Sequence, residues 1–315
     1  MYTKECLMKQ KTELRHIKQT NIDTRKWDNC IAKSINGMVY AYSWYLNIVC
    51  PEWEALVYGD YETVMPLTQN QKYGVSYLYQ PFFTQQLGIF SYNKIDESLI
   101  NQFLNAIPKK FKFIEINLNK YNRLENLDGY TIKENDNYEL DLIENYENIF
   151  RRYNQNNIRN IRKAINNKVS ILKGLMPNDI FGLVKTYGKI PGMKEVHLNM
   201  LRQLIAASIR YKSGYLYGAY NEHNTLVAVG FFVYSNNRAC FILSVSSDEG
   251  KDLSAMFLLV DEFIKDFSNR NMILDFEGSN IDNIARFYRG FGANQFRYLS
   301  IRANNLPFPL KLLKN

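Results

Sequence analysis

The 315 residues are enough for two domains of about 100–200 residues each, and 46% hydrophobic residues can fill their cores. Lys and Arg number 39 against 31 Asp and Glu, so the net charge of +8 favours anionic partners without selecting among nucleotides, phosphates, nucleic acid and membrane surfaces. No run approaches the roughly 20 apolar residues of a membrane-spanning helix, and the N-terminus is too charged for a signal peptide. Cys6, Cys30, Cys50 and Cys240 show no CxxC spacing, so we expect reduced thiols in a cytoplasmic protein.

The first half of the chain predicts two helices followed by strands. A helix capped by Asp23 precedes a helix over residues 40–49, which ends at Pro51. Periodicity and turn residues then predict three strands, a helix and a further strand, over residues 53–58, 62–67, 75–79, 97–107 and 113–118. This order of elements is typical of an α/β domain.

The second half of the chain repeats this order. Strands are predicted over residues 214–220, 226–234 and 239–245, with a turn at 235–238 between the last two. A helix over residues 253–267 has apolar residues at nearly ideal helical spacing, and a strand over 272–276 follows it.

One offset relates the two halves. Tyr58-Gly59, the helix at 97–107 and the strand at 113 each have a counterpart 159 residues later, in Tyr217-Gly218, the helix at 253–267 and the strand at 272. Three agreements at one offset indicate a duplicated strand–strand–strand–helix–strand unit.

A strand over residues 130–142 and a long helix over 146–168 are predicted between the two copies. Residues 150–174 contain seven Lys or Arg and no acid. Ile158, Ile161 and Ile165 are expected to face inward, which leaves Arg159 and Arg162 toward solvent or a cleft. This basic segment is either an anion-binding surface or a solvated helix face, and it lacks the regular aromatic residues that stack on nucleic-acid bases.

Residues 272–302 concentrate polar groups at the end of a predicted strand. The strand ends in Asp275 and is broken by Gly278, and the capping-box pair Ser279 and Asp282 predicts a helix over 280–289. A last strand is predicted over 295–302. Because ligands collect at the carboxyl ends of strands in open α/β folds, this stretch is the predicted functional site.

Two motifs in this stretch carry a resemblance. Residues 275–279 read DFEGS and residues 286–292 read RFYRGFG, which resembles the DFGGS and RFKKGFG signature of FemAB-like proteins, a branch of the GNAT (acyl-CoA N-acyltransferase) superfamily. Residues 157–164, NIRNIRKA, also resemble the helix that opens the second FemAB domain. The resemblance rests on motifs in the second half of the chain and on layout alone in the first.

The resemblance implies two tandem GNAT-like domains, predicted at residues 1–141 and 142–315. Each would be a mixed, mostly antiparallel sheet flanked by helices, in the α/β (α+β) class.

The resemblance also implies an acyl donor, whose pyrophosphate in GNAT folds lies at the N-terminus of the helix after the fourth strand. The corresponding donor residues in this chain are Val245, Ser246, Lys251, Leu253, Ser254 and Ala255. The loop lacks the usual Gln/Arg-x-x-Gly-x-Gly/Ala pattern, and its acidic residues Asp248, Glu249 and Asp252 would repel a phosphate. An acyl-CoA donor and the aminoacyl-tRNA donor of FemAB-like proteins both stay open.

Glu277 is the predicted general base, because it lies at the strand end where GNAT substrates react. The alternative is that Asp275 and Glu277 only cap the turn and the following helix. Tyr288 occupies the place where the resemblance implies a lysine tied to the acceptor and the transition state, which puts a peptidoglycan-bridge activity in doubt. Tyr288 is therefore predicted as a catalytic proton donor.

Four arginines are predicted to bind a phosphate or carboxylate of the substrate, namely Arg159, Arg162, Arg286 and Arg289. The alternative is again a solvated helix face. His16, His197 and His223 lack partners at ligand spacing, so no metal is expected. The chain also lacks a Gly-x-Ser-x-Gly elbow and a Walker loop, which disfavours hydrolases and NTPases.

These observations give three functional hypotheses. The first is an N-acyltransferase that moves an acyl group from an acyl-CoA-type thioester to a small-molecule amine. The second is a FemAB-type aminoacyl transferase that uses aminoacyl-tRNA and a cell-wall precursor. The third is a non-catalytic descendant of the fold that binds an anion or a protein partner.

Overall fold

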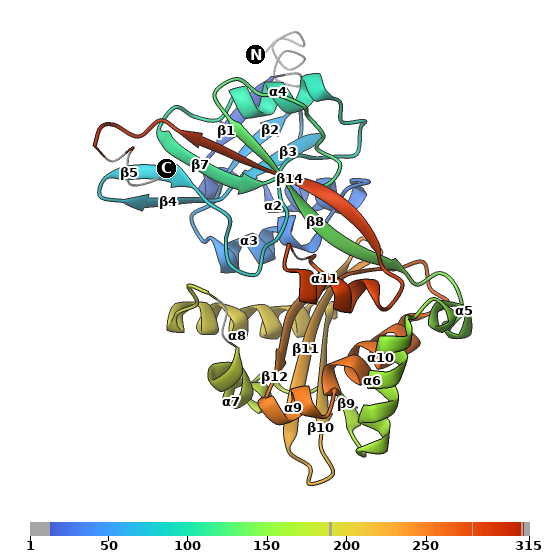
Figure 1. Cartoon of the computed structure of the whole chain (residues 1–315). Coiled ribbons are helices and arrows are strands. Elements are labelled where there is room, and N and C mark those ends of the chain that lie inside the picture. The colour runs from blue at the N-terminus through green and yellow to red at the C-terminus, as the bar shows by residue number, and fades with distance from the viewer. Residues whose placement is uncertain (1–12, 189–190, 279, 310, 312–315) are drawn as a thin grey trace. The chain divides into compact units, whose positions relative to one another are not determined.

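The computed structural model describes residues 13–188, 191–278, 280–309 and 311. The chain forms two compact units, one of residues 1–135 with 297–315 and the other of residues 136–296 (Figure 1). These units differ from the predicted division after residue 141 mainly at the C-terminal end of the chain. The difference arises because residues 300–304 pair with a strand of the first unit.

In the described residues of unit 1, which comprises residues 1–135 and 297–315, a four-stranded sheet and part of a second sheet are accompanied by the helices α2, α3 and α4. One sheet has the strand order β1-β2-β3-β6, and a second set of strands has the order β4-β5-β7-β14. The elements are β1 (Leu14–Ile17), α2 (Thr24–Lys33), α3 (Ser43–Val49), β2 (Glu54–Tyr58), β3 (Thr63–Leu67), β4 (Gln69–Lys72), β5 (Val75–Leu78), β6 (Phe90–Ser91), α4 (Glu97–Asn105) and β7 (Phe111–Asn117), with parts of β8 (Thr131–Asp141) and β14 (Asn294–Asn304). Two short 3-10 helices, Gln19–Asn21 and Val39–Ala41, flank α2.

Local sequence explains the helices of unit 1. The Asp23 carboxylate accepts hydrogen bonds from the backbone N–H groups of Arg25 and Lys26, which satisfies donors that the first turn of α2 leaves open. The buried Trp27 on α2 then packs against Trp53, with ring centroids 4.7 Å apart. Helix α4 buries one face, formed by Ile100, Phe103 and Leu104.

Unit 2, residues 136–296, is built around one sheet with the order β8-β13-β12-β11-β10-β9. Its elements are α5 (Tyr146–Arg151), α6 (Gln155–Asn166), β9 (Ser170–Lys173), α7 (Pro177–Tyr187), α8 (Glu195–Arg210), β10 (Gly214–Tyr220), β11 (Leu226–Ser235), β12 (Arg238–Ser246), α9 (Asp248–Asp252), α10 (Ala255–Phe267), β13 (Ile273–Asp275) and α11 (Asp282–Arg289). Helices α6 and α10 cover one face of this sheet, and α7 and α8 cover the other (Figure 1).

Stacked aromatic rings form the centre of the core of unit 2. Phe232 on β11 stacks between Phe241 of β12, at 4.3 Å, and Phe263 of α10, at 3.8 Å. All three residues are buried, so α10 is fixed on the sheet beside β12 and β13. The predicted class, a mixed α/β protein with mostly antiparallel sheets flanked by helices, is confirmed.

Each unit receives one strand from the other half of the sequence. Strand β8 follows β7 in the chain, but its residues 139–141 pair with β13 in unit 2. Strand β14 follows β13 in the chain, but its residues 300–304 pair with β7 in unit 1. Strand β8, which follows β7, therefore pairs within unit 2, and strand β14, which follows β13, pairs within unit 1. The pairing of β14 explains why the last segment of the chain belongs to unit 1.

Several predicted boundaries are wrong. The helix predicted over 146–168 is two helices, because the Asn154 side chain caps a new start by accepting from the N–H of Asn157. The helix predicted from 253 begins at Ala255, because Ser254 has a left-handed backbone with φ of 58° and separates it from α9. Helix α11 begins at Asp282 rather than 280, and Ser279 of the predicted capping box lies outside the described residues.

Other corrections concern single residues and missed elements. Ile165, predicted to face inward, is 55% exposed, whereas Ile161 is buried. Residue 238, predicted to lie in a turn, begins β12. Strands β1, β4, β6 and β9 and helices α7 and α8 were not predicted from the sequence. Within the part of the chain that the structure describes, no helix is both long and apolar enough to cross a bilayer.

Candidate functional site

The candidate site lies where β12 and β13 separate. These strands run parallel, and their pairing covers only residues 238–240 of β12 and 273–275 of β13. β12 continues to Ser246, while the chain after β13 turns toward β8, where the N–H of Phe276 donates to the carbonyl of Tyr138. Residues 241–246 of β12 thus lack a neighbouring strand on this side among the described residues.

A β-bulge lies at the start of this open strand edge. Phe231 of β11 is opposite Leu243 and Phe232 is opposite Phe241, so Ile242 of β12 has no opposite residue. A bulge of this kind breaks the ladder locally and redirects backbone groups. The open edge therefore presents backbone N–H and C=O groups to a ligand that carries amides.

A buried charge cluster closes the narrow end of the opening. Nη1 of Arg238 lies 2.7 Å from Glu139 and 2.7 Å from Asp275, and all three side chains are buried. Burial raises the pKa of Asp275 above its ordinary value, and Arg238 offsets this rise only in part, because Glu139 adds a second negative charge. For Arg238, burial works against the charge, but the two carboxylates outweigh it and raise its pKa. The guanidinium therefore stays charged.

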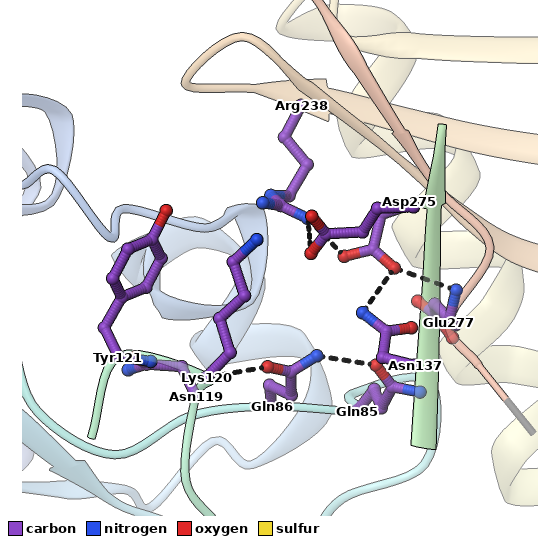
Figure 2. A network of polar contacts seen from close by, with 10 residues as sticks. Gln85, Gln86, Asn119, Lys120, Tyr121, Asn137, Arg238, Asp275 and Glu277 are labelled. Carbon is purple, nitrogen blue, oxygen red and sulfur yellow. Dashed lines mark hydrogen bonds and ion pairs between the residues drawn. The ribbon is translucent and has the colours of Figure 1, made fainter. Parts of the chain in front are cut away.

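The second oxygen of Asp275 fixes the turn that carries Glu277. Asp275 Oδ1 accepts from the backbone N–H of Glu277, at 2.9 Å, and from the Asn137 side-chain amide, at 3.1 Å (Figure 2). Glu277 is half-buried and has a left-handed backbone with φ of 54°, which side chains other than glycine rarely adopt. A Cβ on the next residue, Gly278, would lie 2.2 Å from the carbonyl oxygen of Asp136, so only glycine fits there.

Tyr288 lies on the inner face of α11, close to this turn. Its ring stacks on Phe276 at 4.6 Å, and the side chain is buried. Burial, followed by the negative charges of Glu277 and Asp275, raises the pKa of Tyr288 well above its ordinary value. The phenol is therefore protonated at neutral pH, and its hydroxyl can donate a hydrogen bond.

Asn154, before α6, and Asn157, in the first turn of α6, hold the C-terminal end of α11. The N–H of Asn154 donates to the carbonyl of Gly290 at 2.9 Å, and the Asn157 side-chain amide donates to the carbonyl of Phe287 at 3.2 Å. The start of α6 therefore sets the position of the last turn of α11, which includes Tyr288. The predicted substrate arginines are exposed on these two helices, Arg159 and Arg162 on α6 and Arg286 and Arg289 on α11.

The predicted donor loop is largely occupied with its own contacts. Ser247 caps α9 through the N–H of Gly250, and Lys251 pairs with Asp248 at 2.7 Å. The hydroxyl of Ser254 donates to the side chain of Asn160 on α6 at 2.9 Å. With Lys251 paired, Glu249 and Asp252 leave this loop with a negative charge, as the sequence indicates.

The structure thus places Glu277 and Tyr288 around one carboxylate, that of Asp275. Sequence reasoning missed three buried members of the site, Asn137, Glu139 and Arg238. No sequence signal distinguishes Glu139, because the strand predicted over 130–142 carries several other charged residues, among them Lys133, Glu134 and Asp141.

Comparisons with known proteins bear on the fold. No protein-family model matches the chain, and no curated protein matches its sequence. Among solved structures, FemX superposes with a TM-score of 0.67 at 11% identity, over 95% of this chain and 99% of that one. A tandem GNAT protein from the clavulanic acid biosynthesis pathway gives 0.55 at 13% identity, over 94% and 99%. The L-PGS structure from Bacillus licheniformis gives 0.54 at 11% identity, over 92% and 94%.

These similarities define the class of fold. The chain has the tandem GNAT fold of these structures. Within that class its architecture is FemAB-like, as the DFEGS and RFYRGFG motifs predicted.

Proposed function

We propose that this chain is an N-acyltransferase that moves an acyl or aminoacyl group onto an amine at the end of β13. The observation that carries the proposal is the placement of Glu277 and Tyr288 around Asp275, beside the open edge of β12. A half-buried carboxylate and a protonated phenol are the base and acid that acyl transfer to an amine requires.

The two residues take complementary roles in the reaction. The Glu277 carboxylate accepts a proton from the acceptor ammonium or amine, whose nitrogen then forms a bond to the acyl carbonyl carbon. The bond from that carbon to the leaving sulfur or oxygen breaks, and Tyr288 donates a proton to the leaving group. Backbone N–H groups at the Ile242 bulge are suited to stabilise the negative charge on the carbonyl oxygen.

An acyl-CoA-type donor would use the open strand edge and the predicted donor residues. The pantetheine arm of such a donor carries amides that can pair with residues 241–246 of β12 in the manner of an added strand. The donor residues would be Val245, Ser246, Lys251, Leu253, Ser254 and Ala255. The structure of one neighbour, the tandem GNAT protein, is specified as being without AcCoA, so AcCoA is the ligand named for that protein.

The charge of the donor loop favours a second candidate, aminoacyl transfer from aminoacyl-tRNA. Lys251 is paired with Asp248, so the loop offers no unpaired cation to a pyrophosphate, and Glu249 and Asp252 would repel one. The exposed arginines on α6 and α11 would then bind phosphates of the donor or of the acceptor. A cell-wall precursor and a smaller amine both fit this role of Arg159, Arg162, Arg286 and Arg289.

Donor binding separates the two candidates. Calorimetry with acetyl-CoA and CoA, and filter binding with aminoacyl-tRNA, should give saturation for one donor. If CoA binds at the loop, replacing Asp248 and Glu249 by Asn and Gln should tighten binding, because two repulsive charges are removed. Absence of binding by every thioester and aminoacyl donor would contradict the proposal and leave the hypothesis of an anion-binding or partner-binding descendant.

Substitution of the two proposed catalytic residues tests the site. With the donor that binds, Glu277→Gln and Tyr288→Phe should each lower the transfer rate by roughly 10²–10⁴-fold. The matched control is Asp282→Gln, an exposed acid in the first turn of α11, which should leave the rate within about twofold. Unchanged rates in both site variants would show that these residues are not catalytic.

A further inference from the structure

A buried acid in unit 2, which the proposed reaction does not use, lies beside two tyrosine hydroxyls. Asp261 on α10 is 5% exposed, and the hydroxyl of Tyr146 donates to its two carboxylate oxygens, at 2.9 and 3.0 Å. The hydroxyl of Tyr153 is also buried and has no hydrogen-bond partner within the described residues. We propose that ionisation of Asp261 repositions the C-terminal end of α11, which carries Tyr288, through Tyr153.

The carboxylate of Asp261 is poorly compensated when it is charged. Burial raises the pKa of Asp261 to about 6, although the hydroxyl of Tyr146 and, more weakly, the charge of Lys265 lower it. Lys265 lies 3.8 Å from Glu262, and no cation in the described part of the chain forms an ion pair with Asp261. Asp261 therefore changes between its neutral and its charged form near pH 6.

Tyr153 is close to this carboxylate without being bonded to it. Burial and then the negative charge of Asp261 raise the pKa of Tyr153, and the Tyr153 hydroxyl in turn helps to lower the pKa of Asp261. Each group thus acts on the other, but the Tyr153 hydroxyl does not have the geometry of a hydrogen bond in this structure. A small movement of Tyr153 would complete the bond.

The two charge states of Asp261 differ in the donors that they need. A protonated carboxyl group keeps one O–H and accepts well at its other oxygen, so Tyr146 alone can serve it. A carboxylate accepts at both oxygens, and a buried charge without a cation is costly unless donors surround it. Ionisation should therefore draw the Tyr153 hydroxyl into a hydrogen bond with Asp261, and protonation should release it.

Two contacts connect Tyr153 to the end of α11. Its ring packs edge-on against Phe291, with centroids 5.1 Å apart. The next residue, Asn154, donates its backbone N–H to the carbonyl of Gly290 at 2.9 Å. A movement of Tyr153 toward α10 therefore acts on the two residues that directly follow α11.

A row of stacked rings continues from this point to Tyr288. Phe291 stacks with Phe276 at 6.2 Å, Phe276 stacks with Tyr288 at 4.6 Å, and all three residues are buried. A close-packed interior transmits small displacements, so the position of Tyr288 should follow the charge of Asp261. An effect on the transfer rate rests on the proposed function of Tyr288, whereas the coupling between Asp261 and α11 does not.

The titratable and charged groups that act on Asp261 come from two segments. They are Tyr146 and Tyr153 before α6, and Glu262 and Lys265 on α10. Helix α6 and the sheet, which pack against α10, bury uncharged side chains there, among them Ile161, Ala164 and Phe232. Within this cluster, Asp261 is the group whose charge changes near pH 6.

The test follows backbone amide signals by nuclear magnetic resonance in the full chain, without donor or acceptor, from about pH 4.5 to about pH 8. Signals of residues 259–263 on α10 and of residues 285–291 should shift together, with one midpoint near pH 6. Asp261→Asn should abolish this step in both sets. Histidines titrate in a similar range but are retained in this variant, so only shifts that it abolishes are assigned to Asp261.

Two tyrosine variants separate titration from coupling. Tyr153→Phe keeps the ring against Phe291, so signals of α10 should still titrate while those of residues 285–291 lose most of their step. Tyr146→Phe removes a donor to the charged form and should raise the midpoint in both sets by about one pH unit. The matched control is Glu147→Gln, an exposed acid in the first turn of α5, which should titrate like the wild type.

The outcomes separate this proposal from the proposed function. Circular dichroism should show that all four variants are folded. If residues 285–291 do not share the midpoint of α10, or if Tyr153→Phe leaves their step unchanged, the proposal is overturned. If the step is present but the transfer rate does not change with the same midpoint, the coupling holds and the catalytic role of Tyr288 is contradicted.

Discussion

Arg238 and Asp275 form an ion pair of 2.7 Å with their side chains 8% and 0% exposed. Asp275 is opposite Cys240, the last position at which β12 and β13 pair, so its carboxylate marks the point where the two strands separate, whereas Arg238 begins the paired stretch of β12. The other oxygen of the same Asp275 carboxylate accepts the N–H of Glu277. The position of the proposed general base therefore depends on a buried charge pair formed by two different strands.

Removal of the guanidinium should destabilise unit 2 strongly. Arg238→Met leaves Asp275 and Glu139 buried without their counter-charge, and breaking a buried ion pair in this way costs about 3–5 kcal/mol. Urea unfolding should show this loss. The control is Arg297→Met, which breaks the half-exposed pair with Glu134 in unit 1 and should cost less than about 1 kcal/mol. Equal losses in the two variants would contradict the assigned role of the buried pair.

Glu277 should be dispensable for stability although it is needed for transfer. Its left-handed φ of 54° disfavours glutamate, whereas asparagine adopts this region more readily. Glu277→Asn should therefore change the free energy of unfolding by no more than about 0.5 kcal/mol, since the contact of its N–H with Asp275 is retained. The transfer rate should fall as it does in Glu277→Gln. A large loss of stability would instead indicate that Glu277 has a structural role in the turn.

The elements of the sheet in unit 2 could be predicted because each strand is an apolar run between turn residues. The run at 226–234, for example, is nearly continuous and corresponds to β11, which is buried along most of its length. Helices α7 and α8 were not predicted. Their boundaries depend on weaker signals, such as Pro177 at the first position of α7 and a first turn of α8 without a side-chain cap of the usual type.

The site could be predicted only where its residues are close in sequence. Glu277 and Tyr288 belong to neighbouring motifs, and the structure places both near Asp275. Arg238 was interpreted as a turn residue because it follows Ser235-Asn236-Asn237, and its two partners lie 37 and 99 residues away along the chain. Neither periodicity nor spacing reports a pairing of that kind, since it arises only when β8, β12 and β13 come together.

Asp261 should make the stability of unit 2 depend on pH. Burial raises its pKa to about 6, and the hydroxyl of Tyr146 donates to its carboxylate at 2.9 Å. Because the raised pKa favours the protonated form in the folded state, this contribution to stability is fully present below the unfolded pKa near 3.8 and is lost as the pH rises through about 6. The charged carboxylate therefore destabilises the unit at pH 7–8.

Asp261→Asn should remove this penalty while the side chain can still accept from Tyr146. We expect a gain of up to roughly 3 kcal/mol at pH 8 and little or no gain at pH 4. Thermal unfolding of the two proteins across this pH range measures the difference. A gain that is the same at pH 4 and pH 8 would show that titration of Asp261 is not its cause.

Gly290 should be required for the contact between α6 and the end of α11. A Cβ at Gly290 would lie 2.2 Å from Asn157 Oδ1, although the φ of −63° at this residue suits any amino acid. Gly290→Ala must therefore displace Asn157, whose amide also donates to the carbonyl of Phe287, and overpacking of this kind costs about 1–3 kcal/mol. Hydrogen exchange should become faster in residues 285–291, around Tyr288.

Gly182 in α7 provides the matched control for this last prediction. A Cβ there meets no atom within 4 Å, so Gly182→Ala should stabilise the chain by about 0.5–1 kcal/mol, as expected for alanine in a helix interior. The two alanine substitutions should thus change stability in opposite directions, and only Gly290→Ala should alter exchange in α11. If Gly290→Ala also stabilised the chain, Asn157 of α6 would not hold α11 by close packing, and the position of Tyr288 would depend on its stacking with Phe276.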